Sequence, residues 1–204
     1  MKLEPCCGSQ SRAPKIRALP KFSQRLANLC DNHFPIRVQV LEPPDIHRVN
    51  AALGWLGLSS PVDARAELDA IAPEQQSHPA VLEARWLLCA HEKNWRDALM
   101  VAEREVAVGP DKAAGWLHRA YALRRVEGGG LAQAWDALLP ATEKFPDEAV
   151  IAYNLSCYAC QMNKLTEARA WLHRAITTGD KDVMKKMALE DEDLKPLWAE
   201  IEDL

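Results

Sequence analysis

Two cysteines, Cys157 and Cys160, flank two residues in the segment CYAC. A C-x-x-C pair is a redox centre when the first thiol begins a helix that follows a strand, because the helix N-terminus lowers the thiol pKa. The same spacing supplies half of a zinc site when two more Cys or His ligands lie at a suitable distance. Two small apolar residues that share one helix surface give the same pattern without any chemistry.

The residues around CYAC favour the third interpretation. The segment AYNLSCYACQM has helical periodicity, so both cysteines are expected well inside a helix with no strand before it. A second C-x-x-C or H-x-x-x-H pair is missing. The only other groups that could face the same side are His91 and His118 on other helices, because Cys89 stands at a core place. A redox pair and a zinc ion bridged between helices are kept as alternatives.

The other polar residues do not form a catalytic set. The six histidines make no H-x-x-x-H or H-E-x-x-H pair, and the sequence contains no G-x-S-x-G. The glycines of EGGG, residues 127–130, follow an expected helix rather than a strand, which indicates a turn and not a phosphate-binding loop. We therefore expect no enzyme, and neither a cofactor nor a metal.

The net charge of −4 is unevenly distributed along the chain. Residues 1–44 contain seven Lys and Arg against three Asp and Glu, whereas residues 45–204 contain 18 against 26. This balance does not favour nucleic-acid binding. No apolar run reaches the roughly 18 residues of a membrane span, and the N-terminus lacks the apolar stretch of a secretory signal. We expect a cytoplasmic protein in which most of the six cysteines are free thiols.

Alanines recur at a nearly constant interval through the body of the chain. Ala64, Ala98, Ala134 and Ala168 each follow a turn-like segment, and their spacings are 34, 36 and 34 residues. Small residues at such positions allow neighbouring helices to approach closely, and the apolar residues around them recur at spacings of three and four. The extra two residues fall near the three glycines of EGGG. The sequence therefore predicts stacked helical hairpins.

This pattern resembles the tetratricopeptide repeat family, whose 34-residue helix–turn–helix units carry W-x2-L-G-x2-Y, A-x3-F and P. Trp116 stands at the Trp place, Leu155 at the Leu place, and Leu68, Leu138 and Leu172 stand where Phe is expected. The resemblance implies an all-α fold, a right-handed α-solenoid of about four units. These units would span residues 45–78, 79–112, 113–148 and 149–182.

Three parts of the chain depart from the repeat pattern. The first two units have Arg48 and Leu82 at the Trp place, and Trp86 where a small residue belongs. Residues 183–204 carry two short apolar stripes on a charged background, which is typical of a C-terminal capping segment. Residues 1–44 are basic and contain several prolines, so we expect a partly flexible N-terminal arm.

In the tetratricopeptide repeat family the first helix of each unit lines a concave groove that receives a partner peptide or helix. Carrying those places over residue by residue gives a floor of apolar and aromatic side chains with two arginines beside it. Tyr121 and Tyr153 are the expected anchors, because a tyrosine is large and stiff with a polar tip. The candidate groove residues are Glu83, Leu87, Leu117, His118, Tyr121, Arg124, Arg125, Tyr153, Asn154 and Cys157.

The resemblance implies a non-catalytic module that binds a protein partner, with no nucleic acid and no membrane span. The Lys and Asn residues by which one subclass grips a C-terminal carboxylate do not recur in register here. A small secretion or assembly chaperone that holds a client protein is the alternative, and a homodimer is also left open. A metal or redox protein acting through Cys157 and Cys160 is the third alternative.

Overall fold

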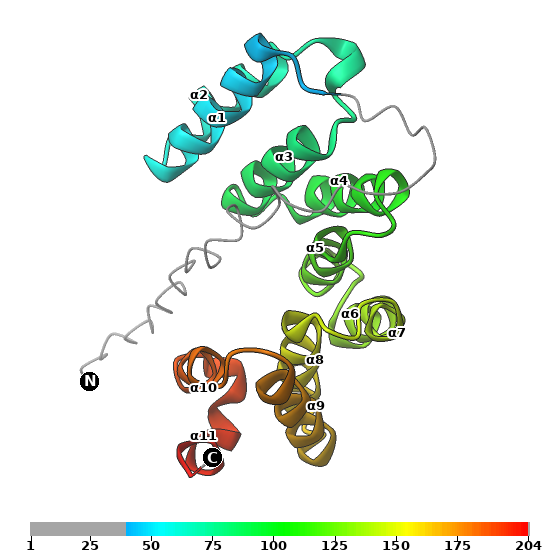
Figure 1. Cartoon of the computed structure of the whole chain (residues 1–204), viewed down its shortest axis with the longest axis vertical. Coiled ribbons are helices and arrows are strands. Elements are labelled where there is room, and N and C mark those ends of the chain that lie inside the picture. Colours follow the sequence, from blue (N-terminus) through cyan, green and yellow to red (C-terminus); the bar gives the residue numbers. More distant parts are fainter. Residues whose placement is uncertain (1–39, 204) are drawn as a thin grey trace, which may run out of the picture. The chain divides into compact units, whose positions relative to one another are not determined.

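The computed structural model describes residues 40–203, and every element within that range is a helix. From α1 to α6 each α-helix contacts the next along the chain, and α8 to α11 continue the series (Figure 1). The α-helices are α1 (Pro43–Gly57), α2 (Pro61–Asp69), α3 (Pro79–His91), α4 (Trp95–Val108), α5 (Ala113–Leu123), α6 (Leu131–Leu138), α7 (Ala141–Lys144), α8 (Ala149–Gln161), α9 (Leu165–Thr178), α10 (Lys181–Leu189) and α11 (Trp198–Glu202). Two 3-10 helices, η2 (Pro73–Gln75) and η3 (Glu192–Leu197), lie between them.

The turns within the helical pairs repeat with the spacing of the alanines. Ser59, Lys93 and Asn163 each adopt a left-handed conformation, with φ of 59°, 57° and 60°. Such a residue ends a helix and lets the following N–H groups return to its last carbonyls. The same backbone hydrogen bond follows in each pair at 2.9 Å, from the N–H of Ser60, Asn94 and Lys164 to the carbonyls of Trp55, Cys89 and Ala159. The sequence period therefore corresponds to a repeated local structure.

The third turn is longer and depends on glycine. Gly128 has φ of 77° and Gly130 has φ of 146°, and side chains rarely adopt either conformation. A Cβ on Gly129 would lie 2.1 Å from the carbonyl oxygen of Leu123. The two extra residues of this repeat are therefore absorbed in the α5–α6 connection, as predicted.

The recurring alanines lie where the paired helices meet. Ala64, Ala98, Ala134 and Ala168 are fully buried, each one near the start of the second helix of a pair. In the last pair Ser156 of α8 donates its hydroxyl to the carbonyl oxygen of Ala168 at 2.8 Å, which brings the two helix backbones together. The predicted all-α array of paired helices is confirmed.

Trp86 is buried despite standing at a place where the repeat pattern has a small residue. Its ring stacks on His118 of α5 with centroids 3.8 Å apart, and its edge meets Tyr121 at 5.8 Å. The indole shares a core cluster with the alanines Ala98 and Ala102 of α4, whose small side chains leave room for it. The departure from the pattern is therefore compensated by small neighbours.

The second helix of the third pair is interrupted, which the repeat pattern did not predict. α6 ends at Leu138 and α7 begins at Ala141, with Pro140 between them. Proline has no N–H to donate and its ring crowds the preceding turn, so a continuous helix is broken there. The division into units at residues 45, 79, 113 and 149 stays a prediction, although α1 already begins at Pro43.

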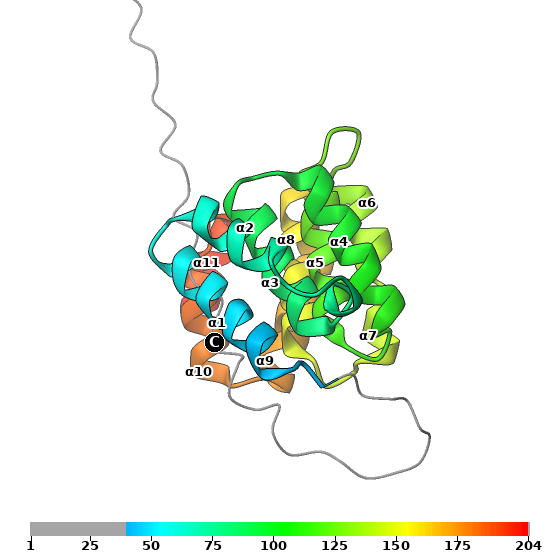
Figure 2. The ribbon, with the colours of Figure 1, turned by 90° about the horizontal axis from the view of Figure 1, so that it is seen from above.

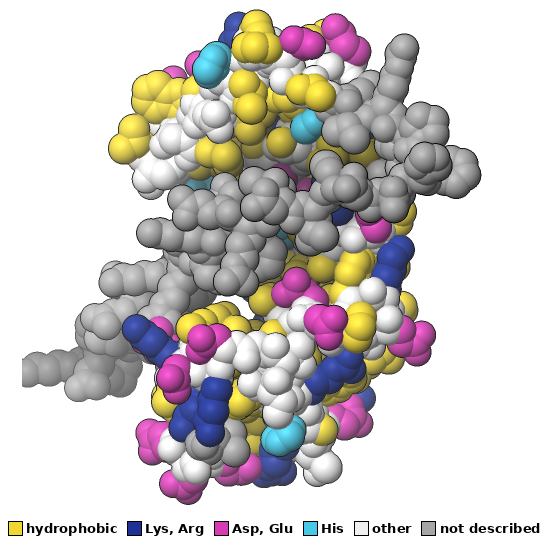
Figure 3. Space-filling view, viewed as in Figure 1, with side chains coloured by type: hydrophobic (Ala, Val, Ile, Leu, Met, Phe, Trp, Pro, Cys, Tyr) yellow, Lys and Arg dark blue, Asp and Glu magenta, His cyan; other side chains and the backbone are white. Residues whose placement is uncertain are grey.

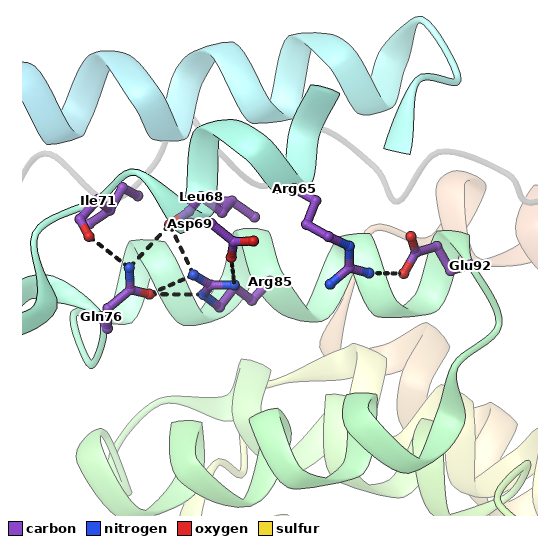
Figure 4. A network of polar contacts seen from close by, with 7 residues as sticks. All are labelled: Arg65, Leu68, Asp69, Ile71, Gln76, Arg85 and Glu92. Carbon is purple, nitrogen blue, oxygen red and sulfur yellow. Dashed lines mark hydrogen bonds and ion pairs between the residues drawn. The ribbon is translucent and has the colours of Figure 1, made fainter. Parts of the chain in front are cut away.

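The connection between the first two pairs is held by a polar network around Arg85 of α3 (Figure 4). Its guanidinium donates to the side chains of Gln76 and Asp69 and to the carbonyl oxygen of Leu68, at 2.7 to 3.0 Å. The amide of Gln76 donates in turn to the carbonyls of Leu68 and Ile71. One side chain therefore ties the end of α2, the loop that follows and α3 together.

We expect Arg85→Met to lower the free energy of unfolding by about 1–2 kcal/mol, because it leaves these partly buried acceptors without their charged donor. Urea titration followed by circular dichroism measures the change. Arg96→Met is the matched control, because Arg96 is exposed on α4 and takes no part in this network. Equal stability of the two variants would contradict the role given to Arg85.

Candidate functional site

The first helices of the four pairs form one layer. α1 contacts α3, and the rings of Trp86 and His118 join α3 to α5. The guanidinium of Arg124, which directly follows α5, lies 5.7 Å from the centroid of the Tyr158 ring on α8. We call the surface that α1, α3, α5 and α8 turn away from their second helices the inner face. This is the surface on which the candidate groove residues were predicted.

The N-terminal part of the inner face carries exposed apolar side chains. Ile46 and Leu53 both lie on α1, and their exposed fractions are 45% and 39%. Figure 3 shows hydrophobic side chains gathered over the region where α1 and α2 lie, in contrast to the charged surface at the other end. Glu83 on α3 is exposed as well, and Leu87 is half-buried.

The C-terminal part of the inner face is covered by the chain itself. α8 lies between α6 on one side and the segment from α10 to α11 on the other (Figures 1 and 2). Leu194, Leu197 and Ile201 of this segment are almost fully buried in the same core cluster as α8. We call residues 191–198 the C-terminal strap.

A polar network fixes the C-terminal strap to α5 and α8. The guanidinium of Arg124 donates to both carboxylate oxygens of Asp193, the second at 2.9 Å. The hydroxyl of Tyr153 donates to Asp191 at 3.0 Å, and the amide of Gln161 donates to the carbonyl oxygen of Asp193 at 3.0 Å. A two-pronged arginine–carboxylate pair restricts the geometry of both partners, so the strap is held in one register.

The structure places the ten predicted groove residues in three different environments. Glu83 is exposed, whereas Leu87, Leu117, Tyr121, Arg124, Arg125 and Asn154 are half-buried, and His118, Tyr153 and Cys157 are buried. His118 lies under Trp86 and contacts Glu105 at 2.7 Å through its Nδ1 atom. It therefore connects α5 to α4 and α3 instead of facing a groove.

The expectation that Tyr153 is an open anchor is wrong. Tyr153 is 5% exposed and Cys157 4% exposed, because the C-terminal strap lies over both. Burial raises the pKa of the Tyr153 hydroxyl, and nearby Cys157 and Asp191 add to the shift, so the group remains a hydrogen-bond donor. Arg124 is likewise committed to Asp193.

CYAC lies inside α8, and both of its thiols are buried. Burial raises the pKa of Cys157 well above its usual value, and the carboxylates of Asp191 and Asp193 raise it further. Burial also raises the pKa of Cys160. A redox C-x-x-C needs the opposite shift, toward the thiolate. The environment therefore fits the interpretation of two small packing residues.

Cys157, Asp191 and Asp193 place one sulfur and two carboxylates within 4.8 Å of one another. These atoms already have partners, because Asp193 accepts two bonds from Arg124, and Asp191 accepts bonds from Tyr153 and from the N–H of Asp193. A guanidinium at this position supplies the positive charge that a cation would bring. The cluster therefore serves to hold the strap.

Arg125, the neighbour of Arg124, has a different environment. Its guanidinium lies 3.4 Å from the centroid of the Tyr121 ring and 5.3 Å from that of Trp95, and it donates to the carbonyl oxygen of Tyr121. Among residues 40–203 no carboxylate forms an ion pair with it. Tyr121 and Arg125 therefore form a cation–aromatic surface that the strap does not use.

Sequence reasoning missed Asp191 and Asp193. Both stand in the run EDED, residues 190–193, which belongs to the charged background of the predicted capping segment. Asp193 lies 69 residues from Arg124, and no local pattern indicates such a pairing.

None of the helices within residues 40–203 is long and apolar enough to span a membrane. A scan of protein-family models and a search of curated proteins give no match to the chain.

Solved structures provide the informative comparison. "MamA 41-end from Desulfovibrio magneticus RS-1" is similar over 79% of this chain and 93% of that one, with a TM-score of 0.57 and 17% identity. "MamA RS-1 ArsTM double mutant" is similar over 67% of this chain and 76% of that one, with a TM-score of 0.56 and 17% identity. MamA is a tetratricopeptide-repeat protein. The chain described here therefore has the tetratricopeptide-repeat fold.

Proposed function

We propose that this chain is a non-catalytic interaction module that binds a peptide or helix of a partner protein on the inner face of α1, α3 and α5. Exposed Ile46 and Leu53 offer apolar area that a partner could bury, at about 25 cal/mol per Å² before ordering costs. The repeat register predicts that Tyr121, which is half-buried, continues this face. The tetratricopeptide-repeat fold supports the proposal, because stacked helical pairs create extended surfaces used for binding.

The C-terminal strap is the observation that carries the proposal. On α8 the inner face already packs against a polypeptide segment that arrives from elsewhere in the chain. That segment contributes buried leucines and two carboxylates, and the face contributes an arginine, a tyrosine and a glutamine. The surface is therefore chemically suited to hold a peptide. A partner would use the remaining helices, because the strap occupies α8.

We expect the double substitution Leu53→Asp with Leu87→Asp to reduce partner capture at least tenfold. Each substitution would place an unpaired carboxylate in an apolar contact with the partner. Partners are first identified by affinity purification of the full chain from its native cell with mass spectrometry, and capture is then compared between variants. Circular dichroism confirms that the variant keeps its helices.

Val62→Asp is the matched control, because Val62 on α2 is 77% exposed and does not belong to the inner face. Capture that survives the inner-face variant, or is lost equally in the control, would contradict the proposal. The chaperone alternative stays a prediction, and stoichiometric copurification of one client together with a dimeric assembly would favour it.

A further inference from the structure

An open pocket lies beside Arg125 at the end of α5. Its volume is about 490 Å³, and its walls come from the α3–α4 turn with the start of α4 and from the α5–α6 loop. Lys93, Trp95 and Arg96 stand on the first wall, and Arg125 and Glu127 on the second. Three cationic side chains therefore face one carboxylate around a space large enough for a side chain of another molecule.

The guanidinium of Arg125 is held in place but only partly used. Stacking on Tyr121 and proximity to Trp95 fix its plane, and one Nη1 hydrogen is donated to the carbonyl oxygen of Tyr121. A guanidinium has five N–H donors in a rigid fork that matches a carboxylate. Burial lowers the pKa of Arg125, and the charge of Arg124 adds to this. A carboxylate at this position would offset the cost of that burial.

The chain contains its own example of the missing contact. On the adjacent side of α5, Arg124 lies near the ring of Tyr158 and receives the carboxylate of Asp193 on its two Nη atoms. Arg124 and Arg125 follow the last residue of α5, where Arg124 bonds to the strap and Arg125 lines the pocket. The two arginines thus have similar aromatic supports, and only Arg124 has an acidic partner among the described residues.

We propose that the pocket of Lys93, Trp95, Arg96 and Arg125 binds an Asp or Glu side chain of an acidic peptide segment in the partner protein. This inference rests on the proposed function, since the partner would continue from the inner face into the pocket. Arg125 forms the two-pronged contact, and Lys93 and Arg96 attract the acidic segment from the rim. The indole of Trp95 offers apolar area to the methylene groups of the bound side chain.

The test uses a fluorescein-labelled peptide with the sequence of residues 189–198, LEDEDLKPLW, and the full chain. We expect anisotropy to show saturable binding at low salt that weakens as salt is raised. Arg125→Gln should weaken binding about tenfold. The affinity of Arg125→Lys should lie between those of Arg125→Gln and the native chain, because lysine keeps the positive charge and loses the two-pronged contact. The peptide LQNQNLKPLW, in which the four acidic residues are replaced by their amides, should bind Arg125→Gln and the native chain alike.

Arg104→Gln is the matched control, because Arg104 is exposed on α4 outside the pocket and its loss should leave binding unchanged. If Arg125→Gln does not fold, the native chain still gives an answer, since the indole N–H resonance of Trp95, assigned with Trp95→Phe, should shift with the acidic peptide alone. Binding that depends on Arg124 rather than Arg125 would mean that the peptide displaces the strap, and it would overturn the inference. So would equal binding of both peptides, or an unchanged Trp95 resonance.

The two proposals fail separately. If Arg125→Gln leaves the affinity for the acidic peptide unchanged, while Leu53→Asp with Leu87→Asp still abolishes partner capture, the pocket inference is wrong. The inner face then remains the proposed binding surface. Partner capture that is insensitive to the inner-face variant would remove the proposed function itself.

Discussion

Replacing Leu194 by Asp is expected to detach the C-terminal strap and to lower the free energy of unfolding by about 3–5 kcal/mol. Leu194 is fully buried against α8, so a carboxylate there would lose its water without gaining a partner. The same cluster contains Leu197 and Ile201, which follow in the chain and would lose their register with it. Urea titration followed by tryptophan fluorescence and circular dichroism measures the loss.

The labelling rate of Cys157 separates local release from general unfolding. In the native chain this thiol is 4% exposed under the strap, and its raised pKa keeps it protonated. Release of the strap removes the cover and the two carboxylates, so alkylation by iodoacetamide, followed by peptide mass spectrometry, should accelerate at least tenfold. Cys89, buried near α4, should keep its rate.

Leu58→Asp is the control for this substitution. Leu58 directly follows α1 and is 74% exposed, so the same change there should alter stability by less than about 0.5 kcal/mol. Faster alkylation of Cys157 in this control, or an unchanged alkylation rate of Cys157 in Leu194→Asp, would contradict the covering role of the strap.

The helical array could be predicted because its physical requirements are local and recur. A buried alanine at each helix crossing is demanded by the close approach of two backbones, and Ala64 and Ala98 meet that demand 34 residues apart. The turns at Ser59, Lys93 and Asn163 could be placed for the same reason, since one left-handed residue ends each first helix. Repetition compensated for the weak match of any single unit.

The candidate site could be predicted only in part, because exposure depends on what covers a face. Helical register placed Tyr153 and Cys157 on the inner side of α8, but nothing near them indicates that residues 191–198 return to that side. The pairing of Arg124 with Asp193 joins positions 69 residues apart. Arg125 is not covered by the strap, because in the turn after α5 it lines the pocket beside the α3–α4 turn. The predictions about residues 1–39 lie outside the described residues.

The strap also changes what the inner face offers a partner. Tyr153 and Arg124 were among the aromatic and cationic residues expected to bind a ligand, and both contact the chain's own carboxylates. The elements still available are Tyr121 and Arg125, with the exposed apolar residues of α1. Under the proposed function a partner would therefore contact the N-terminal three pairs, which is why Leu53 and Leu87 are the informative positions.

Ala168→Leu is expected to lower the free energy of unfolding by about 3 kcal/mol, the upper part of the range for overpacking a core. Ala168 is fully buried where α9 crosses α8, and its carbonyl oxygen accepts the hydroxyl of Ser156 at 2.8 Å. A leucine would have to push α8 away, which would lengthen that bond and leave the buried hydroxyl of Ser156 unsatisfied. Ala170→Leu makes the same change on the exposed side of α9 and should be neutral or slightly stabilising, because leucine is a good helix former. Equal midpoints of the two variants in urea titration would mean that the recurring alanines do not set the distance between paired helices, and the basis of the repeat assignment would be lost.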